Sequence, residues 1–109
     1  MTLQAVVTAS DDSTVIHLAG ELDMFTVGTL REAVQTHLPG PGGRLVVDIA
    51  ELAFCDSLGL GTLLVLSRTA RAHNTLLVLR HPSPYFLRMV EIAGVSAALT
   101  FAPNEPPSH

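Results

Sequence analysis

The sequence predicts one α/β domain, because short segments rich in valine and leucine alternate along the chain with segments of helical periodicity. With 109 residues the chain is long enough for a single hydrophobic core and too short for two. Apolar residues make up 48% and charged residues 15%, which is typical of a globular protein rather than a disordered one. The expected order of elements is β-β-α-β-α-β-α-β, which implies a mixed sheet with parallel crossovers.

Five segments are expected to form the strands. The first two are β-branched and flank the turn-rich residues 10–13, a pattern that predicts a β-hairpin. The third is a nearly continuous apolar run, as expected of a strand that is covered on both faces. The fourth repeats that character, and the fifth is short. In chain order, the expected strands are residues 3–9, 14–19, 44–50, 75–80 and 98–102.

The first helix is expected to begin after Thr26, a candidate N-cap. Phe25 and Leu30 occupy the positions of a hydrophobic staple, which supports that boundary. The segment PGPGG, residues 39–43, ends the helix. The apolar face of this helix consists of Val27, Leu30, Val34 and Leu38.

The other two helices also have clear boundaries in the sequence. The middle helix is expected to begin at Ser57 as its N-cap and to stop near Asn74. Its first half is apolar all round, which indicates close packing against the sheet. The third helix has Ser83 as N-cap, Pro84 at its first position and Gly94 just past its end.

The junction FCDSLGLG, residues 54–61, joins a buried strand to the middle helix. In α/β proteins, ligands and partners bind at such carboxyl ends of strands. The hydroxyl of Ser57 is expected near the unpaired amides of the helix, where a phosphate would find oriented donors. Gly59 and Gly61 each cost the helix about 1 kcal/mol relative to alanine. They let another backbone approach closely, or they serve packing against the sheet, and simple capping by Asp56 and Ser57 is an equal alternative.

A second acidic site follows the second strand, where the sequence reads GELD. If the second and third strands are neighbours, Asp23 lies near Asp56 and beside Ser57. Its carboxylate either shapes the turn into the first helix, or it positions the serine hydroxyl and repels a phosphate.

The motifs of several enzyme classes are incomplete in this chain. The dinucleotide fingerprint lacks its third glycine, since Leu64 stands there, and the absence of lysine excludes a Walker motif. A nucleophile elbow fails because Cys55 occupies its first position. The five histidines show no metal-ligand spacing, so no metal is expected. Because the enzyme motifs are also incomplete, no cofactor or catalytic residue is expected.

Charge and cysteine content narrow the possible partners and compartment. The net charge of −4 and six scattered arginines make nucleic acids and membrane surfaces poor partners. The first positive side chain is Arg31, so no secretory signal is expected, and no apolar run approaches the roughly 20 residues of a membrane span. The single cysteine, Cys55, is compatible with a reducing compartment and is most simply an apolar filler. A cytoplasmic protein is expected, as a monomer or as a weak dimer through an edge strand.

Two motifs together identify a resemblance that covers nearly the whole chain. GELDMFT, residues 20–26, and VVDIAELAFCDSLGLGTLL, residues 46–64, resemble the STAS domain of bacterial anti-sigma factor antagonists. SPYFLRMVEIAGV, residues 83–95, is similar to the third helix of that family. The resemblance implies a STAS domain over residues 1–102 with helices packed mainly on one side of the sheet, and a flexible tail over residues 103–109.

The resemblance also implies a function without catalysis. Family members bind an anti-sigma factor that is a serine kinase, and thereby free the sigma factor. Phosphorylation of the serine after the aspartate, here Ser57, ends binding, and a PP2C-type phosphatase resets the protein. The partner-binding residues that the resemblance implies are Asp23, Asp56, Ser57, Leu58, Gly59 and Gly61.

This sequence departs from the family pattern at Leu58, where a second serine is frequent. Two other interpretations stay open. One is a STAS module that serves a transporter complex or a stress-signalling scaffold without serine phosphorylation. The other is a small nucleotide-binding or hydrolytic enzyme that uses Ser57.

Overall fold

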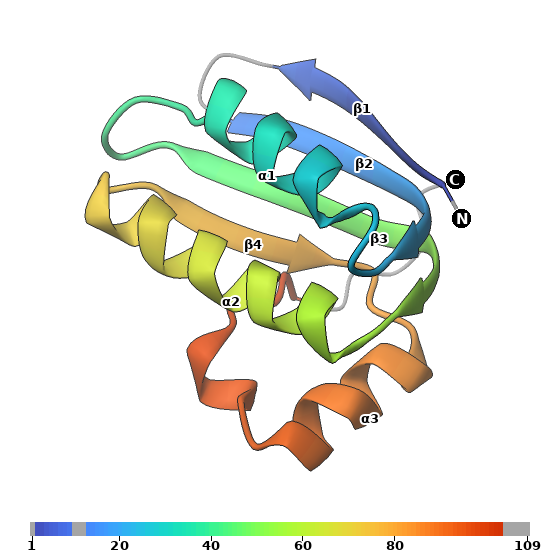
Figure 1. Ribbon diagram of the computed structural model, residues 1–109. Helices are drawn as coiled ribbons and strands as arrows, with labels where there is room; N and C mark the ends of the chain where they lie inside the picture. The colour runs from blue at the N-terminus through green and yellow to red at the C-terminus, as the bar shows by residue number, and fades with distance from the viewer. Residues whose placement is uncertain (1, 10–12, 104–109) are drawn as a thin grey trace, which may run out of the picture.

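The computed structural model describes residues 2–9 and 13–103 as one sheet with helices packed against it (Figure 1). The expected alternation of strands and helices is confirmed up to the third helix. The elements are β1 (Leu3–Ala9), β2 (Ser13–Leu22), α1 (Val27–Thr36), β3 (Arg44–Cys55), α2 (Ser57–Ala72), β4 (Leu76–Arg80), α3 (Pro84–Ala93) and a single 3-10 turn at Ser96–Ala98.

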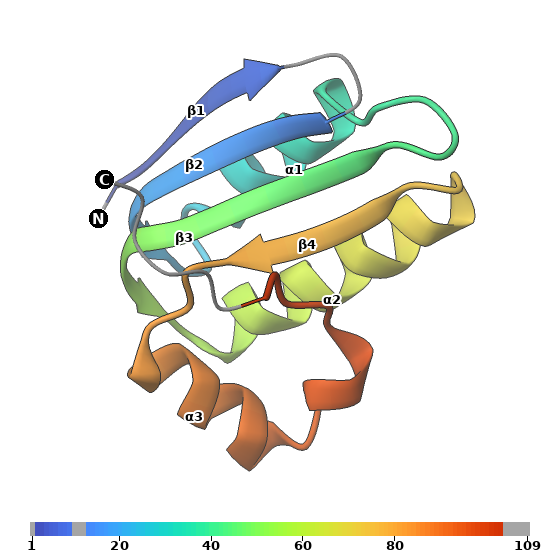
Figure 2. The same cartoon turned by 180° about the vertical axis from the view of Figure 1, so that it is seen from behind.

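The sheet is mixed, as predicted. Its four strands lie in the order β1-β2-β3-β4; β1 runs antiparallel to β2, whereas β2, β3 and β4 are mutually parallel. Helices α1 and α2 cover one face, and α3 lies beyond the β4 edge (Figure 1). Figure 2 shows the other face of the sheet without a helix across it, and we call it the open face. The helices therefore pack mainly on one side, as the resemblance implied.

Two strands differ from the expected ones. β3 continues beyond residue 50 to Cys55, because its end pairs with the end of β2 after two shifts of register near Ala19 and Glu21. The expected final strand, residues 98–102, is wrong as a strand: only one parallel bridge joins Leu79 to Phe101. Pro103 has no amide hydrogen to continue such a ladder. The expected tail lies, from residue 104 onward, outside the described residues.

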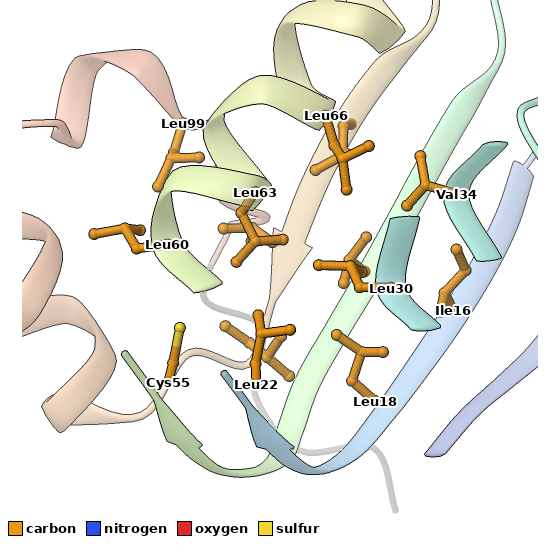
Figure 3. Packing of buried hydrophobic residues seen from close by; sticks show 14 of the residues in the cluster. Ile16, Leu18, Leu22, Leu30, Val34, Cys55, Leu60, Leu63, Leu66 and Leu99 are labelled. Carbon is orange, nitrogen blue, oxygen red and sulfur yellow. The ribbon is translucent and has the colours of Figure 1, made fainter. Parts of the chain in front are cut away.

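The core lies between the covered face of the sheet and the two helices (Figure 3). Alternate residues of the strands point into it, and the helices contribute one apolar face each. Leucines dominate this layer, as the scarcity of aromatic residues requires. The labelled side chains are Ile16, Leu18, Leu22, Leu30, Val34, Cys55, Leu60, Leu63, Leu66 and Leu99.

The predicted starts of α1 and α3 are confirmed, but the side-chain contacts expected at the start of α1 are not found. In α3, the Ser83 hydroxyl accepts a hydrogen bond from the Phe86 amide at 3.0 Å, and Gly94 ends the helix with a φ of 72°. In α1, the Thr26 side chain does not cap the helix but donates to the carbonyl oxygen of Glu21 at 2.7 Å. The predicted staple is also wrong, because the Phe25 side chain points to solvent.

Candidate functional site

Two turns meet at the carboxyl ends of β2 and β3. Leu22 and Cys55, the last residues of these parallel strands, are partners in the ladder. The Asp56 amide donates to the Leu22 carbonyl oxygen at 3.1 Å, so the turn into α2 begins against the turn into α1. β2 and β3 are therefore neighbours, as the prediction that Asp23 lies near Asp56 required. Figure 1 shows the turn into α1 and the turn into α2 at the same end of the sheet.

The start of α2 differs from the prediction by one residue. Asp56, and not Ser57, is the N-cap: its carboxylate Oδ1 accepts a hydrogen bond from the Gly59 amide at 2.8 Å. Ser57 is the first residue of the helix and is exposed. Within the described part of the chain, its hydroxyl forms no hydrogen bond. The helix cap therefore does not require the serine side chain.

The two glycines of this turn lie in different surroundings. Gly59 is buried, and a Cβ atom added to it would lie 2.8 Å from the Leu22 carbonyl oxygen and 3.0 Å from the Cys55 Sγ. The same addition to Gly61 would meet nothing within 4 Å. Gly59 thus serves the packing of α2 against the sheet, whereas Gly61 leaves open space beside the exposed side of the helix.

Asp23 organises the turn between β2 and α1. It is only 4% exposed, and its Oδ1 accepts a hydrogen bond from the Phe25 amide at 2.9 Å and lies 3.3 Å from the Thr26 hydroxyl oxygen. Its Oδ2 is buried and has no hydrogen-bond partner among the described residues. The structure thus supports the turn-shaping interpretation and gives Asp23 almost no surface of its own.

The turn that Asp23 holds presents two large apolar side chains to solvent. Met24 is 62% exposed and Phe25 is 78% exposed. In the neighbouring turn into α2, Leu58 follows Ser57 and is 50% exposed. We call Met24, Phe25, Ser57 and Leu58 the switch surface. The sequence did not predict the exposure of Met24 and Phe25, because its local pattern placed Phe25 in a hydrophobic staple.

Two neighbours of the site are structural. Burial raises the pKa of the Cys55 thiol to about 12, with a further contribution from the charge of Asp56, so the thiol stays protonated. Cys55 therefore behaves as the apolar filler that the sequence indicates. The Tyr85 hydroxyl of α3 donates to the Cys55 carbonyl oxygen at 3.5 Å, which places α3 against the end of β3.

A second group of polar side chains lies on the sheet, away from the switch surface. The buried Asp48 carboxylate accepts hydrogen bonds from the Ala50 amide at 3.0 Å and from the Arg80 Nη2 at 3.0 Å. The Nδ1 atoms of His17 and His81 lie 3.4 Å and 3.3 Å from its oxygens. Burial alone raises the pKa of Asp48, but the Ala50, Arg80 and His81 contacts outweigh it, so the pKa lies below the ordinary value of 3.8. The charged carboxylate is thus the stable form in the fold.

This carboxylate predicts a specific loss of stability in acid. Because the pKa of Asp48 is lowered on folding, its contribution to stability is present above the unfolded value of 3.8 and is lost as the pH falls through the folded value. We expect Asp48→Asn to be less stable than the parent protein at pH 7 and to lose less stability on acidification. Urea unfolding as a function of pH measures this, with the exposed Glu51→Gln on the same strand as the control. Parallel pH curves for the parent protein and Asp48→Asn would contradict the prediction.

No group of three or more histidine, cysteine, aspartate or glutamate side chains among the described residues is arranged to hold a metal ion. None of the described helices is both long and apolar enough to cross a bilayer.

Comparison with known proteins identifies the family. The family model described as "Mlab, STAS domain" matches residues 5–100. The chain is 33% identical over 81 residues to the anti-sigma-B factor antagonist of Listeria monocytogenes, which covers 74% of this chain and 71% of that protein.

Solved structures share the fold. An anti-sigma factor antagonist from Mycobacterium paratuberculosis matches with a TM-score of 0.80 at 22% identity, over 94% of this chain and 87% of that one. SpoIIAA in its unphosphorylated form matches with a TM-score of 0.70 at 25% identity, over 94% of this chain and 90% of that one. The phosphorylated form of SpoIIAA from Bacillus gives a TM-score of 0.66 at 25% identity, over 94% of this chain and 93% of that one. The chain therefore belongs to the STAS domain family, and its relatives include bacterial anti-sigma factor antagonists.

Proposed function

We propose that this protein is an anti-sigma factor antagonist that binds an anti-sigma factor with serine kinase activity and is switched off by phosphorylation of Ser57. The observation that carries the proposal is the state of Ser57: it is exposed at the first position of α2, and the neighbouring Asp56 already caps the helix. A serine that has no structural task at such a position is available to a kinase. The existence of a phosphorylated form of the related SpoIIAA supports the same interpretation.

The unmodified protein offers a surface suited to a protein partner. The switch surface combines three exposed apolar side chains with one small hydroxyl, and Gly61 adds open space on the next turn of α2. Exposed apolar side chains that gather at one place mark interaction sites on soluble proteins. Asp23 and Gly59 contribute indirectly in this proposal, since Asp23 holds the turn that presents Phe25 and Gly59 seats α2 against β2.

A phosphate on Ser57 changes this surface by charge. It adds about −1.5 to −2 elementary charges beside the Asp56 carboxylate. Inside the domain, the positive end of the α2 dipole tolerates that charge. An apolar or acidic partner surface rejects it, because a charge without a partner is costly to desolvate. A penalty of about 4 kcal/mol is enough to turn a nanomolar complex into a micromolar one.

The remaining parts of the cycle follow from this switch. The chain acts by binding and not by catalysis, and a phosphatase of the PP2C type restores the unmodified serine. Both partners are cytoplasmic in this proposal, as is the antagonist. Because position 58 is leucine and not serine, Ser57 carries the only hydroxyl group in the first turn of α2. The exposed Leu58 side chain also adds apolar surface to the docking site.

Single alanine substitutions test the docking surface without changing the phosphorylation site. We expect Phe25→Ala and Leu58→Ala each to weaken binding of the anti-sigma kinase by about 1 kcal/mol or more, because each removes a large side chain from the contact. Isothermal titration calorimetry with the purified kinase measures the affinity. Ile92→Ala is the matched control, since Ile92 is 79% exposed on α3, outside the switch surface. Equal losses in all three variants would mean that the switch surface is not the docking site.

A further inference from the structure

The outer edge of the sheet is formed by β1, which pairs on one side only. β1 is the first strand in the sheet order, and no described residue pairs with its outer side. In both views of the ribbon this edge is free of helices (Figures 1 and 2). Its sequence, LQAVVTA, contains no charged residue and no proline, the residues with which proteins protect an exposed edge. We infer that β1 pairs antiparallel with β1 of a second copy, which makes the protein a symmetric dimer.

The hydrogen bonds of β1 show which backbone groups are free for such pairing. The Glu21 amide donates to the Thr2 carbonyl oxygen at 2.9 Å, in the register that pairs Leu3 with Gly20. Hydrogen-bonded pairs alternate along an antiparallel ladder, so the even-numbered residues of β1 bond to β2. The amides and carbonyls that point outward belong to Leu3, Ala5, Val7 and Ala9.

These outward groups fit a twofold axis at Val6, the central residue of the strand. With Val6 opposite Val6 of the second copy, Ala5 pairs with Val7 and Leu3 with Ala9, all through outward groups. This register overlaps all seven residues of β1, whereas any other register with the same hydrogen-bond phase overlaps fewer. It also places Gln4 opposite Thr8, a polar pair on the open face.

Val6 is the side chain that gains most from the pairing. It is 58% exposed, although it stands in the middle of a regular strand. Two residues at a non-hydrogen-bonded antiparallel position have Cα atoms about 4.5 Å apart, so the two Val6 side chains contact directly. No like charges oppose each other along the strand. Ser57 lies on α2, which packs on β3 and β4, and β2 separates both strands from the β1 edge. Pairing through β1 therefore leaves Ser57 of each copy accessible to a kinase.

Sedimentation equilibrium of the full chain tests the dimer. We expect the mass of the parent protein to rise with concentration from 11.6 kDa toward twice that value. Val6→Lys places two ammonium groups at the twofold axis and should raise the dissociation constant at least about tenfold. Ile92→Lys puts the same charge on an exposed apolar position of α3 and should leave the dimer intact. A parent protein that stays monomeric at all concentrations, or a Val6→Lys variant that dimerises like the parent, overturns the inference.

Disulfide trapping tests the register. Val6→Cys should form a dimer-linking disulfide rapidly in air, because the expected Cα separation lies within the range that a disulfide spans. Gln4→Cys should not, since it faces Thr8 in the second copy. Cys55 is buried, so it does not contribute to the cross-link. Cross-linking of Gln4→Cys as fast as that of Val6→Cys overturns the proposed register.

Discussion

Ser57→Asp is expected to weaken binding of the anti-sigma kinase about tenfold or more, which corresponds to about 1.4 kcal/mol or more. The substituted carboxylate lies on the exposed first residue of α2, next to the Asp56 carboxylate, and therefore carries negative charge into the centre of the switch surface. Aspartate supplies less charge than a phosphate, so the phosphorylated protein should bind more weakly still. Calorimetry or surface plasmon resonance with the kinase measures both affinities.

Ser57→Ala is the matched control for this effect. It removes only an exposed hydroxyl that bonds to no described residue, so binding and stability should both remain near those of the parent protein. The same variant should no longer accept phosphate from the kinase. Equal affinities of the parent protein and Ser57→Asp would count heavily against a charge-operated switch at this position.

Gly59→Ala is expected to destabilise the fold by about 1–2 kcal/mol, although alanine favours a helix over glycine by about 1 kcal/mol. The new Cβ atom would lie 2.8 Å from the Leu22 carbonyl oxygen, which is backbone and has little freedom to move. Relief of this contact requires α2 to move away from the end of β2. Urea unfolding followed by circular dichroism measures the free energy of unfolding.

Gly61→Ala gives the comparison that separates packing from helix propensity. It lies two residues further along the same helix, and its added Cβ atom meets no other atom within 4 Å. We expect a gain of about 0.5–1 kcal/mol, the usual benefit of alanine over glycine inside a helix. A stabilised Gly59→Ala would show that the approach of α2 to β2 is looser than the structure indicates.

The sequence was sufficient for the elements whose signals are local. The boundaries of α3 were predicted correctly because Ser83, Pro84 and Gly94 each have a strong positional preference. The junction of β3 and α2 was also located, but the N-cap was assigned to Ser57 instead of Asp56. Both residue types are favoured caps, and only the three-dimensional path of the turn decides which carboxylate or hydroxyl reaches the free amide.

Features that depend on the sheet register could not be read from the chain. His17, Asp48 and His81 come together because β2, β3 and β4 are adjacent and parallel, while about 30 residues separate each from the next. The exposure of Phe25 was missed for a similar reason, since the staple pattern is local but the Asp23 hydrogen bonds direct the turn outward. The end of β3 was missed because Glu51 interrupts the apolar run, and residues 51–55 continue as a strand through pairing with the end of β2.

The most direct test of the proposed switch is intact-mass spectrometry with peptide mapping, after the protein has been incubated with ATP and each anti-sigma kinase encoded in the same genome. The account predicts that one kinase adds a single phosphate, that the phosphate maps to Ser57, and that Ser57→Ala remains unmodified. A kinase that binds the switch surface but leaves Ser57 unmodified would contradict the account and would favour a STAS module that works without serine phosphorylation.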